Sequence, residues 1–275
     1  MEAIHDEGRV EAREALLDAV EALGRHADAA ILVGAQAIYV HTESQEASFA
    51  VSPFTYDADI ALDPDLLESS PALAEAMEGA GFTLGDQPGL YRRGDRSQVD
   101  LLVPEAVSGP GRRGARLGPH GNRAAMKVHG LEGVLVSHTR RAIRSLFPGA
   151  DRSCILKVAG PAALLVSKVH KIGERASGSS PQRREPLPKD AFDVYRLLRA
   201  VDAARMASEL GLLLAHEVSR QVTSDALAMF ERLFGTRSGV GTELVVQHVL
   251  GLEDPDFMAE SSVALCQELL EAVSQ

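Results

Sequence analysis

The chain has 275 residues, of which 45% are hydrophobic and 24% are charged, so it can bury one large core or two smaller ones. Its formal net charge of −11 argues against a protein that coats nucleic acid over its whole surface, because such binding depends on many Lys and Arg contacts to phosphate. No apolar run approaches the roughly 18 residues of a membrane span and the amino terminus is acidic, so we expect a cytoplasmic protein without a membrane partner.

The first half of the chain has the periodicities of a mixed α/β domain. An amphipathic pattern predicts a first helix from about residue 11 to 26, and a short apolar run ending at Gly34 predicts a strand followed by a helix over 35–41. Residues 56–62 alternate with period two and predict a second strand. The other elements expected here are a helix over 66–79, a hairpin with strands at 89–92 and 98–103, an irregular connection over 104–123, and strands near 133–136 and 155–158.

The second half of the chain is predicted to be almost wholly helical. Gly160-Pro161 places a proline in the first turn of a helix, and helical patterns resume after the loop 177–188. We therefore expect an α+β domain over residues 1–158 and a mainly helical domain over residues 159–275. Cys154 and Cys266 are too few for a disulfide framework or a zinc site, so we expect reduced thiols.

Three aspartates in predicted strands form the first candidate site. Asp57 and Asp59 lie two residues apart on one strand, so their carboxylates project to the same side and repel one another unless a cation lies between them. Asp100 lies within a second apolar strand, where a carboxylate is out of place unless it is paired or bound to metal. The alternative is that Asp57 and Asp59 mark a strand end while Asp100 pairs with an arginine, because a D-x-D sequence is common.

The order of these parts resembles the polymerase-beta-like nucleotidyltransferase fold, a mixed sheet with flanking helices followed here by a helical lobe. Within that superfamily the chain is most similar to the AbiEii and MenT group of toxin-type nucleotidyltransferases, over residues of about 31–198. The matching segments are Leu32-Val33-Gly34-Ala35-Gln36-Ala37 with His41, Thr55-Tyr56-Asp57-Ala58-Asp59-Ile60, Val99-Asp100-Leu101-Leu102, Leu165-Val166-Ser167-Lys168-Val169-His170 with Arg175, and Lys189-Asp190-Ala191-Phe192-Asp193-Val194-Tyr195.

The resemblance implies transfer of a nucleoside monophosphate from a nucleoside triphosphate to a hydroxyl. It implies that Asp57, Asp59 and Asp100 hold two Mg²⁺ ions, with Mn²⁺ as an alternative, and that the turn of Gly34, Ala35 and Gln36 binds the nucleotide. The family usually has Gly-Gly or Gly-Ser at this turn. Ala35 therefore lacks a hydroxyl for the phosphates, although the backbone N–H groups at the helix start can still bind an anion.

The acceptor is predicted only through the resemblance. The toxin group includes enzymes that extend the 3′ end of tRNA, so tRNA is the first candidate acceptor, Arg112-Arg113 and Arg183-Arg184 are candidate phosphate contacts, and a cognate antitoxin is a candidate partner. An antibiotic or protein hydroxyl is the second candidate. A catalytically inactive nucleotide-binding protein of the same fold is a third interpretation, which Ala35 favours and the three aspartates oppose.

A cationic stripe is predicted on the helix that begins at Pro161, where Lys168, Lys171 and Arg175 fall on one face. A solvated surface would explain it, but such a face near a metal site would bind triphosphate, so we assign Lys171 and Arg175 to the nucleotide. The resemblance makes Lys168 the catalytic lysine and gives Asp190 a role with it, although the helix dipole alone also favours an acid at that position. We expect Lys168 to be accessible and to contribute little to stability.

Overall fold

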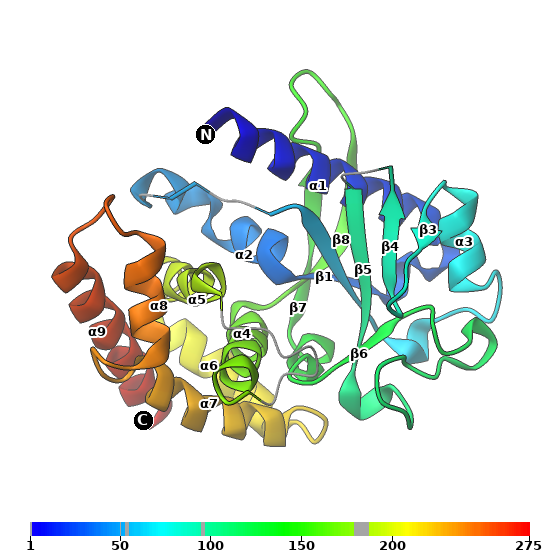
Figure 1. The fold of residues 1–275 in the computed structure, drawn as a ribbon. Helices are drawn as coiled ribbons and strands as arrows, with labels where there is room; N and C mark the ends of the chain where they lie inside the picture. Colours follow the sequence, from blue (N-terminus) through cyan, green and yellow to red (C-terminus); the bar gives the residue numbers. More distant parts are fainter. Residues whose placement is uncertain (1, 50, 53–54, 95–96, 179–186) are drawn as a thin grey trace. The chain divides into compact units, whose positions relative to one another are not determined.

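The chain has an α+β fold, with an open mixed sheet and a helical C-terminal region (Figure 1). The structure is a computed structural model that describes residues 2–49, 51–52, 55–94, 97–178 and 187–275. It divides into unit 1, Met1–Ala37 with Pro53–Ala159, and unit 2, Ile38–Ser52 with Gly160–Gln275. Each unit is described by itself below. Within the described residues, no helix combines the length and the apolar character needed to cross a membrane.

Unit 1 is built on a sheet with the strand order β3-β4-β5-β2-β1-β8-β7, and β6 pairs with β5. β1 is antiparallel to β2 and parallel to β8, whereas β2 and β5 are parallel. The two strands that carry the aspartates are therefore neighbours, as the sequence predicts. The strands are β1 (Ala30–Val33), β2 (Asp57–Leu62), β3 (Thr83–Leu84), β4 (Leu90–Arg93), β5 (Ser97–Pro104), β6 (Met126–Val128), β7 (His138–Arg144) and β8 (Ser153–Ala159).

Helix α1 (Glu2–Leu23) packs against β2, β5 and α3 (Leu73–Gly79). The apolar face of α1 is fully buried at Leu16, which explains why an amphipathic sequence forms this helix. Its polar face binds Arg152, the residue before β8, through Asp18 and Glu21 at 2.5 and 2.8 Å. Helix α2 (Gly34–Thr42) follows β1 without an intervening loop.

Unit 2 is a set of helices packed pairwise, α4 with α5 and α7, α5 with α8, and α6 with α9. The apolar face predicted for α4 is buried at Leu165, Val169 and Ile172. The helices are α4 (Pro161–Ala176), α5 (Pro188–Ala200), α6 (Ala203–Ala215), α7 (Arg220–Phe234), α8 (Val240–His248) and α9 (Pro255–Val273).

Residues 38–52 belong to unit 2 through contacts with α5. The guanidinium of Arg196 lies 4.5 Å from the ring centre of Phe49 and donates a hydrogen bond to the carbonyl of Val51. The ring of Phe192 packs edge-on against Phe49, with centroids 6.2 Å apart. These aromatic and cation–π contacts attach a segment that precedes β2 in the chain to the C-terminal helices.

Most predicted elements are confirmed, including the hairpin of β4 and β5, but three predictions are wrong. α1 begins at Glu2 and not near residue 11. The helix expected over 66–79 begins only at Leu73, because Pro71 interrupts it and disfavours a helical conformation at the residue before it. The strand expected near 133–136 is a 3₁₀-helix, η6 (Glu132–Leu135), and the strand lies at β7 instead.

Candidate functional site

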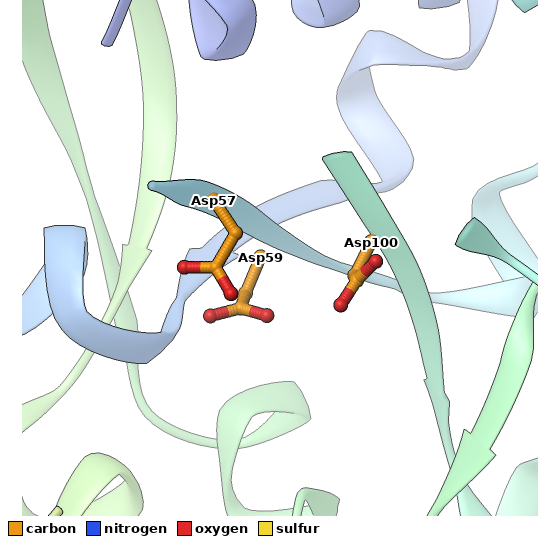
Figure 2. A group of neighbouring side chains, drawn as sticks. All are labelled: Asp57, Asp59 and Asp100. Atoms are coloured by element: carbon orange, nitrogen blue, oxygen red, sulfur yellow. The ribbon is translucent and has the colours of Figure 1, made fainter. Parts of the chain in front are cut away.

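Asp57, Asp59 and Asp100 converge on one side of the sheet of unit 1 (Figure 2). A carboxylate oxygen of each lies within 4.8 Å of those of the other two. Asp59 is directly opposite Asp100 in the parallel pairing of β2 with β5, and Asp57 lies two residues earlier on the same face. The predicted convergence of the three carboxylates is confirmed.

The opposite face of these two strands explains why the aspartates point where they do. Ala58 and Ile60 of β2, and Val99 and Leu101 of β5, are fully buried. Because side chains alternate along a strand, burying these four residues turns the aspartates to the other face. All three aspartates are only half-buried there, so a ligand can reach them.

A polar network holds the start of β2. Thr55 Oγ1 donates a hydrogen bond to the Asp57 carboxylate at 2.5 Å. Gln36 Nε2 donates to the main-chain carbonyls of Asp57 at 3.2 Å and Ala12 at 3.0 Å, while Gln36 Oε1 accepts from Arg13 Nε at 2.9 Å. The Gln36 side chain therefore positions the strand. Any contact of Gln36 with a nucleotide would have to be made by its backbone. No local pattern in the sequence marks Arg13 for this role, since its burial beside Gln36 depends on the packing of α1 with α2.

The donor set fits a divalent cation. Three carboxylates this close repel one another, and the repulsion is relieved when a cation binds between them. Carboxylate oxygens are the ligands that Mg²⁺ and Mn²⁺ accept in proteins. Gln98 Nε2 donates to Asp100 Oδ1 at 3.3 Å and so helps to orient the third carboxylate. These three aspartates could hold a metal ion.

Gly34 begins α2 directly beside this group. Its φ of +65° is in the left-handed region that side chains other than glycine rarely adopt. A Cβ atom at this position would overlap the Asp59 carboxylate. Glycine is therefore required both by the backbone conformation and by the close approach of Asp59, and the first turn of α2 lies next to the carboxylates. Ala35 is buried and brings no polar side chain to this turn.

The chain matches no model of a known protein family and no curated protein sequence. Its function is therefore inferred from the chemistry of the residues described above and of the ion cluster in unit 2.

Lys168 of unit 2 is the centre of a buried ion cluster between α4 and α5. Its amine lies 2.7 Å from a carboxylate oxygen of Asp190 and 2.7 Å from one of Asp193. Only 5% of Lys168 is exposed, so the expectation of an accessible lysine is wrong. The local reason is that two acids of α5, not solvent, face this side of α4. The predicted association of Lys168 with Asp190 is present, and the catalytic role of either residue stays a prediction.

Three further cations surround the two carboxylates. Lys171 and Arg175 lie 3.0 and 3.1 Å from Asp190, and Lys189 lies 3.6 Å from Asp193. The predicted cationic stripe is thus partly neutralised by α5. Lys171 keeps 44% of its side chain exposed against 10% for Arg175, so Lys171 is the more accessible of the two residues assigned to the nucleotide.

The charges of the cluster stabilise one another against the effect of burial. Burial alone would raise the pKa of Asp190 and Asp193, but Lys168 and the neighbouring lysines lower both pKa values below the usual range. Burial would likewise lower the pKa of Lys168, and the two carboxylates overcome it and raise that pKa. All three groups therefore stay ionised at neutral pH, and removing any one leaves a buried charge without its main partner.

Replacing Gly34 tests the contact with Asp59. Gly34→Ala should lower the free energy of unfolding by more than the roughly 1–2 kcal/mol that a left-handed alanine costs, because its Cβ also displaces the Asp59 carboxylate. Gly24→Ala is the matched control, since Gly24 has a φ of +50° and no atom within 4 Å of its Cβ position. Urea unfolding measures both losses, and equal losses would contradict the close approach of Asp59.

Replacing Lys168 tests the ion cluster. Lys168→Met should lower the free energy of unfolding by about 3–5 kcal/mol at pH 7, because it leaves two buried carboxylates with weaker partners. Lys171→Met removes a cation whose side chain is 44% exposed, so it should lower the free energy of unfolding by less than about 1 kcal/mol.

The decrease in the free energy of unfolding caused by Lys168→Met should also become smaller as the pH falls from 7 to 4. In the parent the pKa values of Asp190 and Asp193 are depressed, so their stabilisation is complete above the unfolded pKa of about 3.9 and is lost only below it. Without Lys168 these pKa values rise, and protonation at pH 4 removes the unfavourable buried charge. Urea unfolding at both pH values measures the difference. A loss that is independent of pH would mean that Lys168 stabilises the helices by packing and not by charge.

Proposed function

We propose that this protein is a magnesium-dependent nucleotidyltransferase with a polymerase-beta-like fold, which transfers a nucleoside monophosphate from a nucleoside triphosphate to an acceptor hydroxyl. The observation that carries the proposal is the convergence of Asp57, Asp59 and Asp100, each with an oxygen within 4.8 Å of the others. Two acids at i and i+2 on one strand, with a third directly opposite on the next strand, form a donor set suited to two-metal phosphoryl transfer.

The order of the elements around the carboxylates supports the same reaction. β1 ends at Val33, α2 begins at Gly34, and β2 then returns antiparallel to β1 with Asp59 opposite Val33. Gly34, the first residue of α2, lies against Asp59, so the N–H groups of the first turn of α2 would bind a phosphate of the donor nucleotide near the carboxylates. The resemblance to the AbiEii and MenT group implies the same arrangement of parts.

The residues of this chain would have the following roles in the reaction. Mg²⁺, when bound by the three aspartates, would neutralise the triphosphate and acidify the acceptor hydroxyl. Asp57 and Asp59 would act on the donor by holding the cation that neutralises it, with Thr55 fixing the Asp57 carboxylate. The acceptor oxygen forms a bond to the α-phosphorus, the bond from that phosphorus to the oxygen that bridges to the β-phosphate breaks, and pyrophosphate leaves with the electron pair. Asp100 would take the proton of the acceptor hydroxyl.

We propose the 3′ end of tRNA as the first acceptor and a toxin–antitoxin pair as the setting, because the resembled group includes tRNA-modifying toxins. Lys171 and Arg175 remain the proposed triphosphate contacts, with Lys168 and Asp190 acting with them. Arg183 and Arg184, two of the predicted RNA contacts, lie outside the described residues. Hydroxyls of proteins and small molecules are the alternative acceptors that the following experiment separates.

The test is incubation of the protein with Mg²⁺, each α-³²P nucleoside triphosphate in turn, and total RNA or total protein. Label on RNA supports the proposal, and label on protein would show that the acceptor is a protein hydroxyl. If no mixture yields a labelled product, the proposed transferase activity is wrong. Asp59→Asn should lower transfer by about 100-fold or more, because it removes a carboxylate from the metal-binding group. Asp65→Asn, which removes an exposed carboxylate of the same unit, should leave transfer unchanged.

Metal binding can be measured without any acceptor. Mn²⁺ or Mg²⁺ should raise the melting temperature of the parent and of Asp65→Asn, because a ligand that binds only the folded state stabilises it, and EDTA should reverse the rise. Asp59→Asn should show a much smaller rise. An equal rise in Asp59→Asn would show that the cation binds elsewhere.

A further inference from the structure

Residues 106–128 of unit 1 contain no Asp or Glu, although acids outnumber bases by 39 to 28 in the whole chain. The segment follows β5, the strand that carries Asp100, and ends with β6, which pairs with the last residues of β5. This segment is therefore positively charged in an otherwise acidic protein. The basic residues of this segment are Arg112, Arg113, Arg116, Arg123 and Lys127.

Backbone hydrogen bonds tie together the parts of this segment that carry four of these cations. Lys127 N donates to the carbonyl of Arg113 at 2.8 Å, and Arg116 N donates to the carbonyl of Ser108 at 2.8 Å. Lys127 Nζ donates to the carbonyl of Gly109 at 2.7 Å, which turns the amine toward the same loop. We name Arg112, Arg113, Arg116 and Lys127 the cationic cluster.

The cationic cluster has no acidic partner within the part of the chain that the structure describes. Its three arginines are exposed, and the Lys127 ammonium donates to a main-chain carbonyl, which does not neutralise its charge. Some other arginines of the chain are neutralised by acids: Arg152 binds three carboxylates and Arg237 binds two. Four like charges on one short segment favour an anionic ligand, because such a ligand relieves their mutual repulsion.

The position of the cationic cluster relates it to the carboxylates of the same unit. Asp100 and Pro104, the last residue of β5, are four residues apart, which is about 13 Å along a strand. The segment that bears the cluster begins there. An extended polyanion is long enough to span this distance between Asp100 and the start of the segment.

We propose that the cationic cluster binds the phosphate backbone of the RNA that supplies the acceptor hydroxyl, an inference that rests on the proposed function. The cluster is spread over an exposed loop and residues 106–128 contain no Phe, Tyr or Trp, so it offers charge without a surface for stacking bases. Contacts of this kind position an RNA without selecting its sequence. They also offset the repulsion between RNA and an otherwise acidic protein.

The test is equilibrium binding of fluorescein-labelled tRNA to the full chain, followed by anisotropy over a series of KCl concentrations in EDTA and without nucleotide. Arg112→Gln/Arg113→Gln/Arg116→Gln should weaken binding by at least about tenfold at low salt. The slope of log K against log salt should fall by about 0.7–0.9 for each phosphate that the variant no longer neutralises. The corresponding triple replacement by Lys keeps the charge and should keep the slope.

The matched control is Arg140→Gln/Arg141→Gln/Arg144→Gln on β7, which makes the same change in net charge with exposed arginines of the same unit. It should bind tRNA nearly as the parent does. If both glutamine triples weaken binding equally, net charge alone is responsible and the proposal is overturned. Melting temperatures check the fold, and where a triple variant does not fold, the single variants Arg112→Gln and Arg116→Gln should each lower the slope by about 0.7–0.9.

The binding assay involves no turnover, so this inference and the proposed function can fail separately. If the parent transfers label to RNA while the cluster variant binds tRNA unchanged, the cluster is not the RNA contact and the transferase stands. If the cluster variant alone loses tRNA binding but no nucleotide is ever transferred, the RNA contact stands and the transferase is wrong.

Discussion

The parallel pairing of β2 with β5 is the constraint on which the candidate site depends. Asp59 faces Asp100 only in this register, and a slip of one residue would turn one set of carboxylates into the buried face. The register is held from the buried face by Ile60 and Leu101, which have no exposed surface. It is held at the open end by Gln36, which binds the backbone of Asp57. Apolar burial therefore supplies the free energy that brings like charges together, and the carboxylates themselves contribute repulsion.

The aspartates and the pairing of their strands could be predicted from the sequence because they follow from period-two alternation and from the order of the elements. The network of Arg13 with Gln36 could not, since it joins α1 to α2 across residues that carry no local pattern. Residues 38–52 likewise join unit 2 through Arg196, far along the chain. The sequence did not predict β7, because it is an edge strand in which only Ile143 is buried. Its exposed arginines leave no visible alternation of apolar and polar residues.

The expectation that Lys168 is accessible was wrong for a reason of the same kind. Helical periodicity placed it correctly on a face with Lys171 and Arg175, but periodicity within one helix does not show what lies opposite that face. α5 brings Asp190 and Asp193 there, and the face becomes an interior ion cluster. Sequence patterns give the side of an element on which a residue lies, whereas its burial depends on the partner element.

The aspartates of unit 1 and the ion cluster of unit 2 differ in burial, and this difference bears on their roles. In unit 2, Asp190 and Asp193 are almost fully buried and bound by cations from the chain itself, so the group is complete when the protein folds. In unit 1, Asp57, Asp59 and Asp100 are half-buried and lie against one another. Three carboxylates this close together at an accessible position could hold a metal ion. A divalent cation would relieve their mutual repulsion, because carboxylate oxygens are ligands that it accepts.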